Sequence, residues 1–322
     1  MSNLNSISKR GYLKVGVSLG FKGFSEKNCR THEWHGFDVD YAKALAIALF
    51  NEHTAIEFVP LASKERFRAL TGGGIDIGCF NATISFKREM RENIRFSIPT
   101  IYDGEVFATR RKNLKSEVAV LSNTLERKIA VIRGSTTFSN VEYYSEKNKI
   151  DYTPVFFDTP RDALESYELG ETDIYCLDFY LLNGELSRLN SPQEHVILND
   201  EVSLEAMAPA FTSQSSDLLN IMNWTIRATI EAERLAITSQ TVHAELQHNH
   251  PKSYHYNFLK TFYKKTWDLS EDKTTIYNII SSVGNYEEIF SRSLGAESDL
   301  KLPRRSNILR QNGGLLSSPL FI

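Results

Sequence analysis

The sequence predicts an α/β protein made of two similar lobes. Strand and helix signals alternate through the first hundred residues, a pattern that is typical of a parallel α/β sheet. The same order of signals returns between residues 128 and 176. Residues 73–79 and 170–176 also share the pattern Gly-x-x-Asp-Ile-x-Cys. Together these observations indicate two related halves, each with its own sheet.

The first half contains three apolar runs of strand length, at residues 12–17, 56–59 and 75–79. Between the first two, apolar side chains recur at helical spacing from Asp38 to Phe50, which predicts an amphipathic helix. A second, short helix is expected from Ser63, closed by three successive glycines.

The second half repeats this order, with expected strands at residues 128–132, 153–157 and 172–176. Thr159 is a candidate N-cap for a helix that runs through Leu169 and ends at Gly170. Five residues after the aspartate of each shared pattern stands a polar residue, Asn81 in one half and Asp178 in the other. Both therefore follow the carboxyl end of a strand, where open α/β sheets bind ligands.

Two segments are expected to cross between the lobes, Gly104 to Arg110 and Met207 to Thr212. Accordingly, lobe 1 is assigned residues 1–108 and 207–322, and lobe 2 residues 109–206. A long helix is expected from Ser216 to Leu235. The remainder, from Thr241, is irregular and mostly helical in pattern, and we expect it to wrap lobe 1.

Composition excludes several classes of function. With 322 residues and a formal net charge of -3, and without a run of Lys and Arg, the chain is not expected to bind nucleic acid. No apolar stretch reaches the ~18 residues of a transmembrane helix. The three cysteines, Cys29, Cys79 and Cys176, imply no disulfide framework.

The first ten residues contain no apolar core and no cleavage site of a signal peptide. This leaves two alternatives, an exported protein whose leader is not part of this sequence and a cytosolic protein. We expect the first.

A series of short motifs, in a fixed order, resembles the polar amino acid-binding proteins of bacterial ABC transporters, and in particular their general L-amino acid-binding subgroup. The motifs span residues 9 to 321 and include Gly23-Phe24-Ser25, Trp34-His35-Gly36-Phe37-Asp38-Val39-Asp40, Asn81-Ala82-Thr83-Ile84-Ser85-Phe86-Lys87-Arg88, Gly134-Ser135-Thr136-Thr137 and Asn307-Ile308-Leu309-x-x-x-Gly313-Gly314-Leu315. The resemblance implies a two-lobed, type II periplasmic-binding-protein fold with two hinge strands and a C-terminal helical extension.

The resemblance also implies a function. The chain is expected to be a periplasmic monomer that closes on a free L-amino acid and delivers it to the permease of an ABC transporter. No catalytic residue, cofactor or metal is implied. The sequence departs from the subgroup at Val15 and Ala42, where cysteines are usual, and at Phe80, Ile84 and Phe179, which we expect close to the pocket.

An amino acid zwitterion requires a cation for its carboxylate and an anion for its ammonium group. Arg88 matches the family's carboxylate-binding arginine, and a guanidinium can grip a carboxylate through two parallel hydrogen bonds. Thr83 and Ser85 precede it at alternate positions and face one side of an extended segment. Asp178 matches the family's ammonium-binding position. Because it belongs to the other lobe, ligand binding is expected to drive closure.

Further ligand contacts are expected from Ser135 and Thr136, which follow a strand and precede a helix, where N–H groups suit an anion. Phe21 or Phe24 is expected to form an apolar wall over the aliphatic part of the ligand.

Two alternatives remain open. Related scaffolds include cyclohexadienyl dehydratases, and the expected cleft offers Asp178, Glu105 and Glu205, although no histidine with a partner. A sensor domain without transport fits the same fold. A Gly-x-Ser-x-Gly pattern at 16–20 lacks the helix of a nucleophile elbow, and Cys29, His32 and His35 lack a fourth metal ligand.

Overall fold

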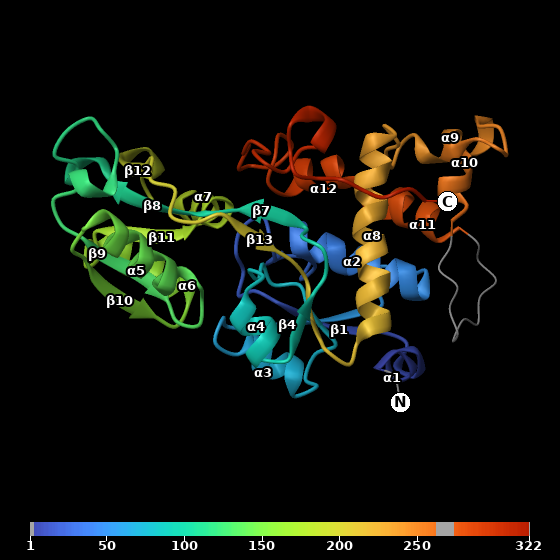
Figure 1. The fold of residues 1–322 in the computed structure, drawn as a ribbon, viewed down its shortest axis with the longest axis horizontal. Helices are drawn as coiled ribbons and strands as arrows, with labels where there is room; N and C mark the ends of the chain where they lie inside the picture. Colours follow the sequence, from blue (N-terminus) through green and yellow to red (C-terminus); the bar gives the residue numbers. More distant parts are fainter. Residues whose placement is uncertain (1–2, 262–273, 322) are drawn as a thin grey trace.

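The computed structural model describes residues 3–261 and 274–321. It contains two five-stranded sheets, each covered by helices, that form two lobes side by side (Figure 1). A pair of strands runs between them, and the described helices of the C-terminal part of the chain lie on the side of lobe 1 (Figure 1). None of the helices in these described ranges has the length and apolar character needed to cross a bilayer.

The sheet of lobe 1 has the strand order β4-β1-β5-β14-β6. Strands β1 and β4 pair in parallel, as do β1 and β5, whereas β14 runs antiparallel to β5 and β6. The strands are β1 (Leu13–Val17), β4 (Ile56–Pro60), β5 (Ile77–Gly78), β6 (Ile94–Phe96) and β14 (Ala210–Thr212), and the helices packed with them include α2 (Phe37–Phe50), α3 (Arg66–Thr71) and α4 (Phe86–Arg91). The short helix expected from Ser63 therefore begins three residues later.

The sheet of lobe 2 has the order β10-β9-β11-β8-β12, which repeats the arrangement of the first sheet. Its strands are β8 (Glu105–Arg110), β9 (Lys128–Ile132), β10 (Thr153–Phe157), β11 (Ile174–Asp178) and β12 (His195–Ile197), and its helices are α5 (Thr137–Asn148), α6 (Pro160–Leu169) and α7 (Phe179–Leu186). Thr159 caps α6 by accepting a hydrogen bond from the backbone of Asp162, and Gly170 ends the helix in the left-handed conformation.

The repeated aspartate has the same structural role in both lobes. Asp76 accepts a hydrogen bond from the backbone N–H of Lys14 in β1, at 2.7 Å, and Asp173 accepts one from the backbone N–H of Lys128 in β9, at 3.1 Å. In each case the carboxylate fixes the start of the neighbouring parallel strand. The shared sequence pattern therefore reflects a shared way of joining helix and strand.

The lobes are connected through strands β7 (Ile101–Asp103) and β13 (Glu205–Met207), which pair antiparallel between the two sheets. Residues 105–110, expected to cross between the lobes, instead form β8 within the second sheet. Residues 210–212, also part of an expected crossing, lie in the first sheet as β14. The chain thus passes between lobes a few residues earlier than the sequence suggested.

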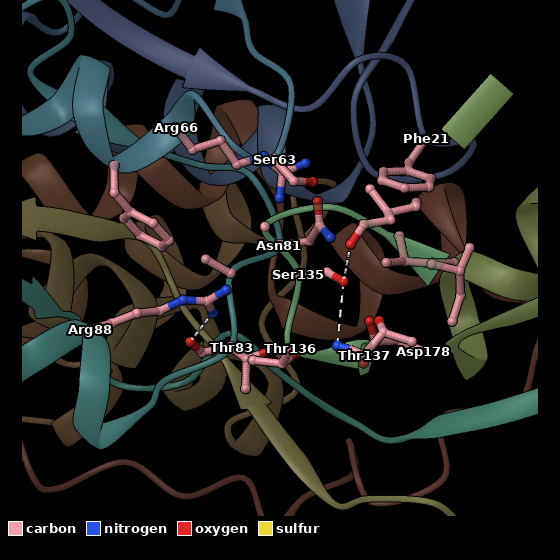
Figure 2. A pocket seen from close by; sticks show the side chains of 16 residues that line it. Phe21, Ser63, Arg66, Asn81, Thr83, Arg88, Ser135, Thr136, Thr137 and Asp178 are labelled. Carbon is pink, nitrogen blue, oxygen red and sulfur yellow. Dashed lines mark hydrogen bonds between the residues drawn. The ribbon is translucent and has the colours of Figure 1, made fainter. Parts of the chain in front are cut away.

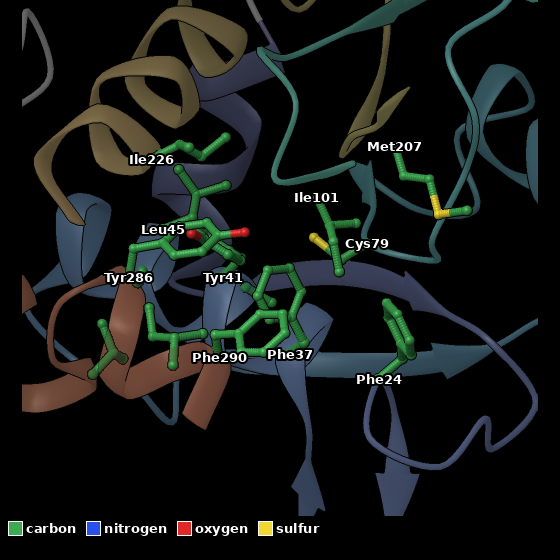
Figure 3. Close-up of a cluster of buried hydrophobic side chains, with 14 of the residues drawn as sticks. Phe24, Phe37, Tyr41, Leu45, Cys79, Ile101, Met207, Ile226, Tyr286 and Phe290 are labelled. Carbon is green, nitrogen blue, oxygen red and sulfur yellow. The ribbon is translucent and has the colours of Figure 1, made fainter. Parts of the chain in front are cut away.

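Helix α2 lies at the centre of lobe 1 and is buried on nearly all sides. The prediction of an amphipathic helix, with one face exposed to solvent, was therefore wrong. Its first residue, Phe37, makes edge-to-face contacts with Phe24, Tyr41, Tyr286 and Phe290 (Figure 3). Two of these rings come from α12, in the C-terminal part of the chain. The C-terminal helix α12 therefore covers an apolar face of α2 that would otherwise be exposed to solvent.

The C-terminal part packs on lobe 1, as expected for the region after Thr241, of which residues 262–273 lie outside the described ranges. The long helix α8 (Ser216–Arg234) is followed by α9 (Val242–His248), α10 (Tyr254–Leu259), α11 (Thr275–Val283) and α12 (Tyr286–Ser293), and α11 and α12 both contact α2 and α8. The remaining described elements are α1 (Asn3–Arg10), β2 (Glu26–Lys27), β3 (Trp34–His35) and four short 3-10 turns at 111–113, 121–123, 192–194 and 310–312.

Candidate ligand-binding site

A cavity lies between the two lobes and is lined by side chains from both (Figure 2). Six of the eight side chains predicted from the sequence line it: Phe21, Thr83, Arg88, Ser135, Thr136 and Asp178. The other lining residues are Ser63, Arg66, Phe67, Asn81, Ala82, Ile132, Gly134, Thr137, Leu177 and Leu181. Polar groups of opposite charge and apolar side chains thus face one enclosed space, as in small-molecule binding sites.

Arg88 enters the cavity from helix α4 of lobe 1. Ser85 caps this helix by accepting a hydrogen bond from the backbone of Arg88, so its hydroxyl is used for folding and Ser85 does not line the cavity. The guanidinium of Arg88 donates to the carbonyl of Thr83 and stacks on Phe67, 4.8 Å from the ring centre. These contacts hold the side chain in place and leave most of its five N–H donors for a ligand.

Asp178 reaches the cavity from the end of strand β11 in lobe 2. The residue is buried, and its Oδ1 atom has no hydrogen-bond partner among the described residues. Burial raises the pKa of this carboxyl well above its usual range, and the nearby charges of Glu205, Glu105 and Asp103 raise it further. A cationic group in the cavity would satisfy both the unpaired oxygen and the unfavourable negative charge.

Asp178 is one of three buried carboxylates that lie together where the hinge meets the cavity. Oxygen atoms of Glu105, Asp178 and Glu205 lie within 4.8 Å of one another. Burial, followed by the charge of Glu205, raises the pKa of Glu105 to about 8. These three residues could hold a small cation through oxygen ligands, but only Asp178 lines the cavity, so the group that fits best is a ligand's ammonium ion held by that one carboxylate.

Glu205 connects the two lobes beneath the cavity. Its carboxylate accepts hydrogen bonds from the hydroxyls of Thr83 in lobe 1 and Thr136 in lobe 2, and from the side chain of Asn140 in helix α5. Both threonines line the cavity. Glu205 therefore orients two cavity hydroxyls at once, one on each side of the hinge.

The turn before helix α5 contributes Ser135 and Thr136 to the cavity. The hydroxyl of Ser135 donates to the carbonyl of Ile132 at 2.7 Å and accepts from the backbone N–H of Thr137 at 3.3 Å, which fixes the turn (Figure 2). The start of this twelve-residue helix faces the cavity, and the N-terminus of a helix favours an anion. The carboxylate of a ligand is the group that benefits.

Phe21 and Phe24, predicted as alternative apolar walls, have different positions. Phe21 lines the cavity, whereas Phe24 is fully buried in the core of lobe 1 against Phe37, at a ring-centre distance of 6.2 Å. The Gly-Phe-Ser motif thus places its aromatic ring in the core. The sequence alone could not distinguish the two rings, because both stand in the same loop.

The three departures from the family pattern also lie outside the cavity lining. Phe80 is buried behind it, Ile84 packs in a small core under the sheet edge, and Phe179 lies beneath the guanidinium of Arg305 at 4.5 Å. All three nevertheless adjoin the cavity wall: Ile84 and Phe179 directly follow the lining residues Thr83 and Asp178, and the backbone carbonyl of Phe80 accepts a hydrogen bond from Arg66.

Sequence reasoning missed Arg66, Asn81 and Ser63 as cavity residues. Asn81 was noted only as the counterpart of Asp178 after the repeated pattern. Arg66 carried a signal, since it lies four residues before Leu70 and so on the apolar face of a short helix. A charged residue on such a face is rarely buried unless it has a partner or a function.

The two lobes touch on both sides of the cavity. Lys64 of lobe 1 pairs with Asp158 of lobe 2 at 3.1 Å, and Glu26 of lobe 1 pairs with Arg188 of lobe 2 at 2.9 Å. The backbones also meet, since a Cβ added to Gly184 in helix α7 would lie 2.9 Å from the carbonyl oxygen of Lys22. The structure is therefore a closed arrangement of the lobes.

Comparison with known proteins identifies the architecture. Residues 13–243 match the model of the bacterial extracellular solute-binding proteins, family 3. The chain is 33% identical over 319 residues to the general L-amino acid-binding periplasmic protein AapJ of Rhizobium johnstonii, covering 99% of this chain and 92% of that protein. It is 28% identical to the glutamate/glutamine/aspartate/asparagine-binding protein BztA of Rhodobacter capsulatus, covering 99% and 93%.

A solved structure agrees over the whole length. The ABC transporter periplasmic binding protein of Brucella ovis, with glutathione bound, superposes with a TM-score of 0.92 at 33% identity, covering 99% of each chain. An ancestral amino acid-binding protein described as a precursor of cyclohexadienyl dehydratase gives a TM-score of 0.60 at 25% identity and covers 72% of this chain. The expected type II periplasmic-binding-protein fold is thereby confirmed.

Proposed function

Because the chain belongs to family 3 of the bacterial extracellular solute-binding proteins, we propose that it is the substrate-binding component of an amino acid ABC transporter. It closes its lobes on a free L-amino acid and presents the closed form to the permease. One observation carries the proposal. A guanidinium from lobe 1 and a buried carboxylate from lobe 2, Arg88 and Asp178, face the same cavity.

The charges suit the two ends of an amino acid. Arg88 binds the α-carboxylate, with the start of helix α5 as a further source of positive potential. Asp178 binds the α-ammonium group, which supplies the partner that its Oδ1 atom lacks among the described residues. Since each lobe offers only one of the two charges, the ligand is held well only when the lobes are closed.

Two relatives support recognition of an amino acid head group. One is named for its general binding of L-amino acids. The other was solved with glutathione, which carries a free α-amino and α-carboxyl group at its γ-glutamyl end. A protein that recognises these two groups through Arg88 and Asp178 is open to a range of side chains.

We further propose that the protein acts outside the cytoplasmic membrane, because its family is extracellular by name and a relative is named as periplasmic. We also propose that it acts as a monomer. We propose no catalytic role. The cavity lining contains no histidine or cysteine within the described ranges, although the group of Glu105, Asp178 and Glu205 is the feature that an enzyme on this scaffold would use. Turnover of a cyclohexadienyl acid would support the enzyme, and a partner other than a permease would support a sensor.

The test is ligand-induced stabilisation. The purified protein is unfolded, freed of bound ligand and refolded, and its thermal unfolding is then recorded with each of the common L-amino acids. A ligand at about a hundred times its dissociation constant stabilises the folded state by roughly 2.7 kcal/mol. We expect stabilisation by several amino acids and its loss in Arg88→Ala, with exposed Lys87→Ala as the matched control. Stabilisation by none of them would remove the proposal.

A further inference from the structure

A second guanidinium, that of Arg66, lines the cavity and is held in a fixed position. Arg66 is the first residue of helix α3 and is only 7% exposed. One Nη atom donates to the carbonyl of Phe80 and the other to the hydroxyl of Ser18, both at 2.8 Å. The group also lies over the ring of Phe80, 5.2 Å from its centre. Its geometry is therefore set before any ligand arrives.

This guanidinium is not saturated by the protein. Its two hydrogen bonds use two of five N–H donors, and the Nε atom has no acceptor among the described residues. Within the described ranges Arg66 forms no ion pair with a carboxylate closer than 4.0 Å. A buried cation in this condition favours an additional acceptor, above all an anion.

The carboxyl group of Asp38 offsets the positive charge of Arg66 only in part. Asp38 is buried, one of its oxygens lacks a hydrogen-bond partner among the described residues, and burial raises its pKa to about 7 despite the attraction of Arg66. Burial and then the like charge of Arg88 lower the pKa of Arg66 to about 9, so the guanidinium is still charged at neutral pH. The cavity thus contains a positive charge that Asp38 neutralises only in part.

Arg66 lies at the end of the cavity away from Asp178, the group assigned to the ammonium end of the amino acid. Figure 2 shows Arg66 and Ser63 on one side, and Thr83, Thr136 and Asp178 on the opposite side, with Asn81 between them. A ligand whose carboxylate and ammonium groups are held by Arg88 and Asp178 therefore extends its side chain toward Arg66. Phe21 borders the same end and restricts the path of that side chain (Figure 2).

We propose that Arg66 is a specificity-determining residue that selects L-amino acids with an acidic side chain, glutamate and aspartate, over aliphatic amino acids of similar size. This inference rests on the proposed function, because it assumes that Arg88 and Asp178 hold the amino acid head. Glutamine and asparagine, which offer a neutral oxygen acceptor, bind less tightly than the acids and more tightly than leucine. Ser63 and Asn81 add polar contacts at the same end.

The experiment is isothermal titration of the refolded, ligand-free protein with L-glutamate, L-glutamine and L-leucine. Wild type is expected to prefer glutamate to leucine by about 10-fold or more. Arg66→Gln is expected to weaken glutamate binding by about 10- to 100-fold and to change leucine binding by less than about 3-fold. Arg68→Gln, an exposed arginine on the same helix, is the matched control and is expected to leave both affinities unchanged.

A second variant keeps the test decisive should Arg66→Gln fold poorly. Ser63→Asp places a carboxylate beside Arg66 and is expected to weaken glutamate binding while leucine binding persists. An equal loss for glutamate and leucine in Arg66→Gln, or a wild type that binds leucine as tightly as glutamate, overturns the inference while the proposed function stands. A wild type that binds no amino acid removes the proposed function itself.

Discussion

The side-chain amide of Asn307 forms two hydrogen bonds with the backbone of Tyr102. Its Oδ1 accepts from the N–H of Tyr102 at 2.7 Å, and its Nδ2 donates to the carbonyl of Tyr102 at 2.8 Å. Tyr102 lies in hinge strand β7, and the hydroxyl of Tyr180 in lobe 2 accepts a further bond from the same amide. A residue near the C-terminus thus holds the hinge and touches both lobes.

Removing this amide should destabilise the protein. Asn307 is fully buried, so Asn307→Ala leaves the backbone groups of Tyr102 without partners. We expect a loss of about 2 kcal/mol in the free energy of unfolding. Urea denaturation measures it, and Asn312→Ala, at an exposed position of the same tail, serves as the control. Equal stability of the two variants would mean that the tail does not support the hinge.

The buried carboxylates should make the stability of the ligand-free protein depend on pH. Burial raises the pKa of Glu105 to about 8 and that of Asp103 to about 7, so the folded state holds protons that the unfolded state has released. Stability contributed by these groups is present below the unfolded pKa values of about 4 and is lost as pH rises through the folded values. The temperature at the midpoint of thermal unfolding should therefore decrease as the pH is raised from 5 to 8.

Glu105→Gln isolates the part of this dependence that comes from one carboxyl. The amide does not titrate, so the variant should lose less stability than wild type between pH 5 and pH 8 and unfold several degrees higher at pH 8. Glu171→Gln, which changes an exposed residue beyond Gly170, should keep the slope of wild type. An unchanged slope in Glu105→Gln would contradict the assignment.

Closure should be sensitive to Gly184. An added methyl group would lie 2.9 Å from the carbonyl oxygen of Lys22 in the other lobe, while alanine suits the helix interior better than glycine by about 1 kcal/mol. Gly184→Ala should thus preserve stability and weaken amino acid binding about 10-fold. Calorimetric titration gives the affinity, and small-angle scattering shows whether ligand still compacts the protein. Wild-type affinity in this variant would exclude tight closure at this contact.

The order of strands and helices was predictable because each lobe repeats one pattern, with Asp76 and Asp173 fixing equivalent strands. That Arg88 and Asp178 would line one cavity was predictable from the resemblance to a known family. The position of Phe24 was not predictable, because Phe21 is the same residue type in the same loop. Only the packing of Phe24 against Phe37 shows which of the two rings belongs to the core and which lines the cavity. The link from Glu205 to both Thr83 and Thr136 was equally hidden, because it joins segments far apart in the sequence.

Arg88 and Asp178 are proposed to hold the two charged ends of one amino acid. The decisive measurement is calorimetric titration of the ligand-free protein with its tightest L-amino acid, with the N-acetyl derivative and with the α-amide of the same compound. We expect each derivative to bind at least about 30-fold more weakly than the parent, because the amide leaves the charge of Arg88 unpaired and the N-acetyl group leaves that of Asp178 unpaired. We also expect Asp178→Asn to lose affinity for the parent amino acid. Binding of the N-acetyl derivative as tightly as the parent would exclude the proposed role of Asp178 in holding the ammonium group.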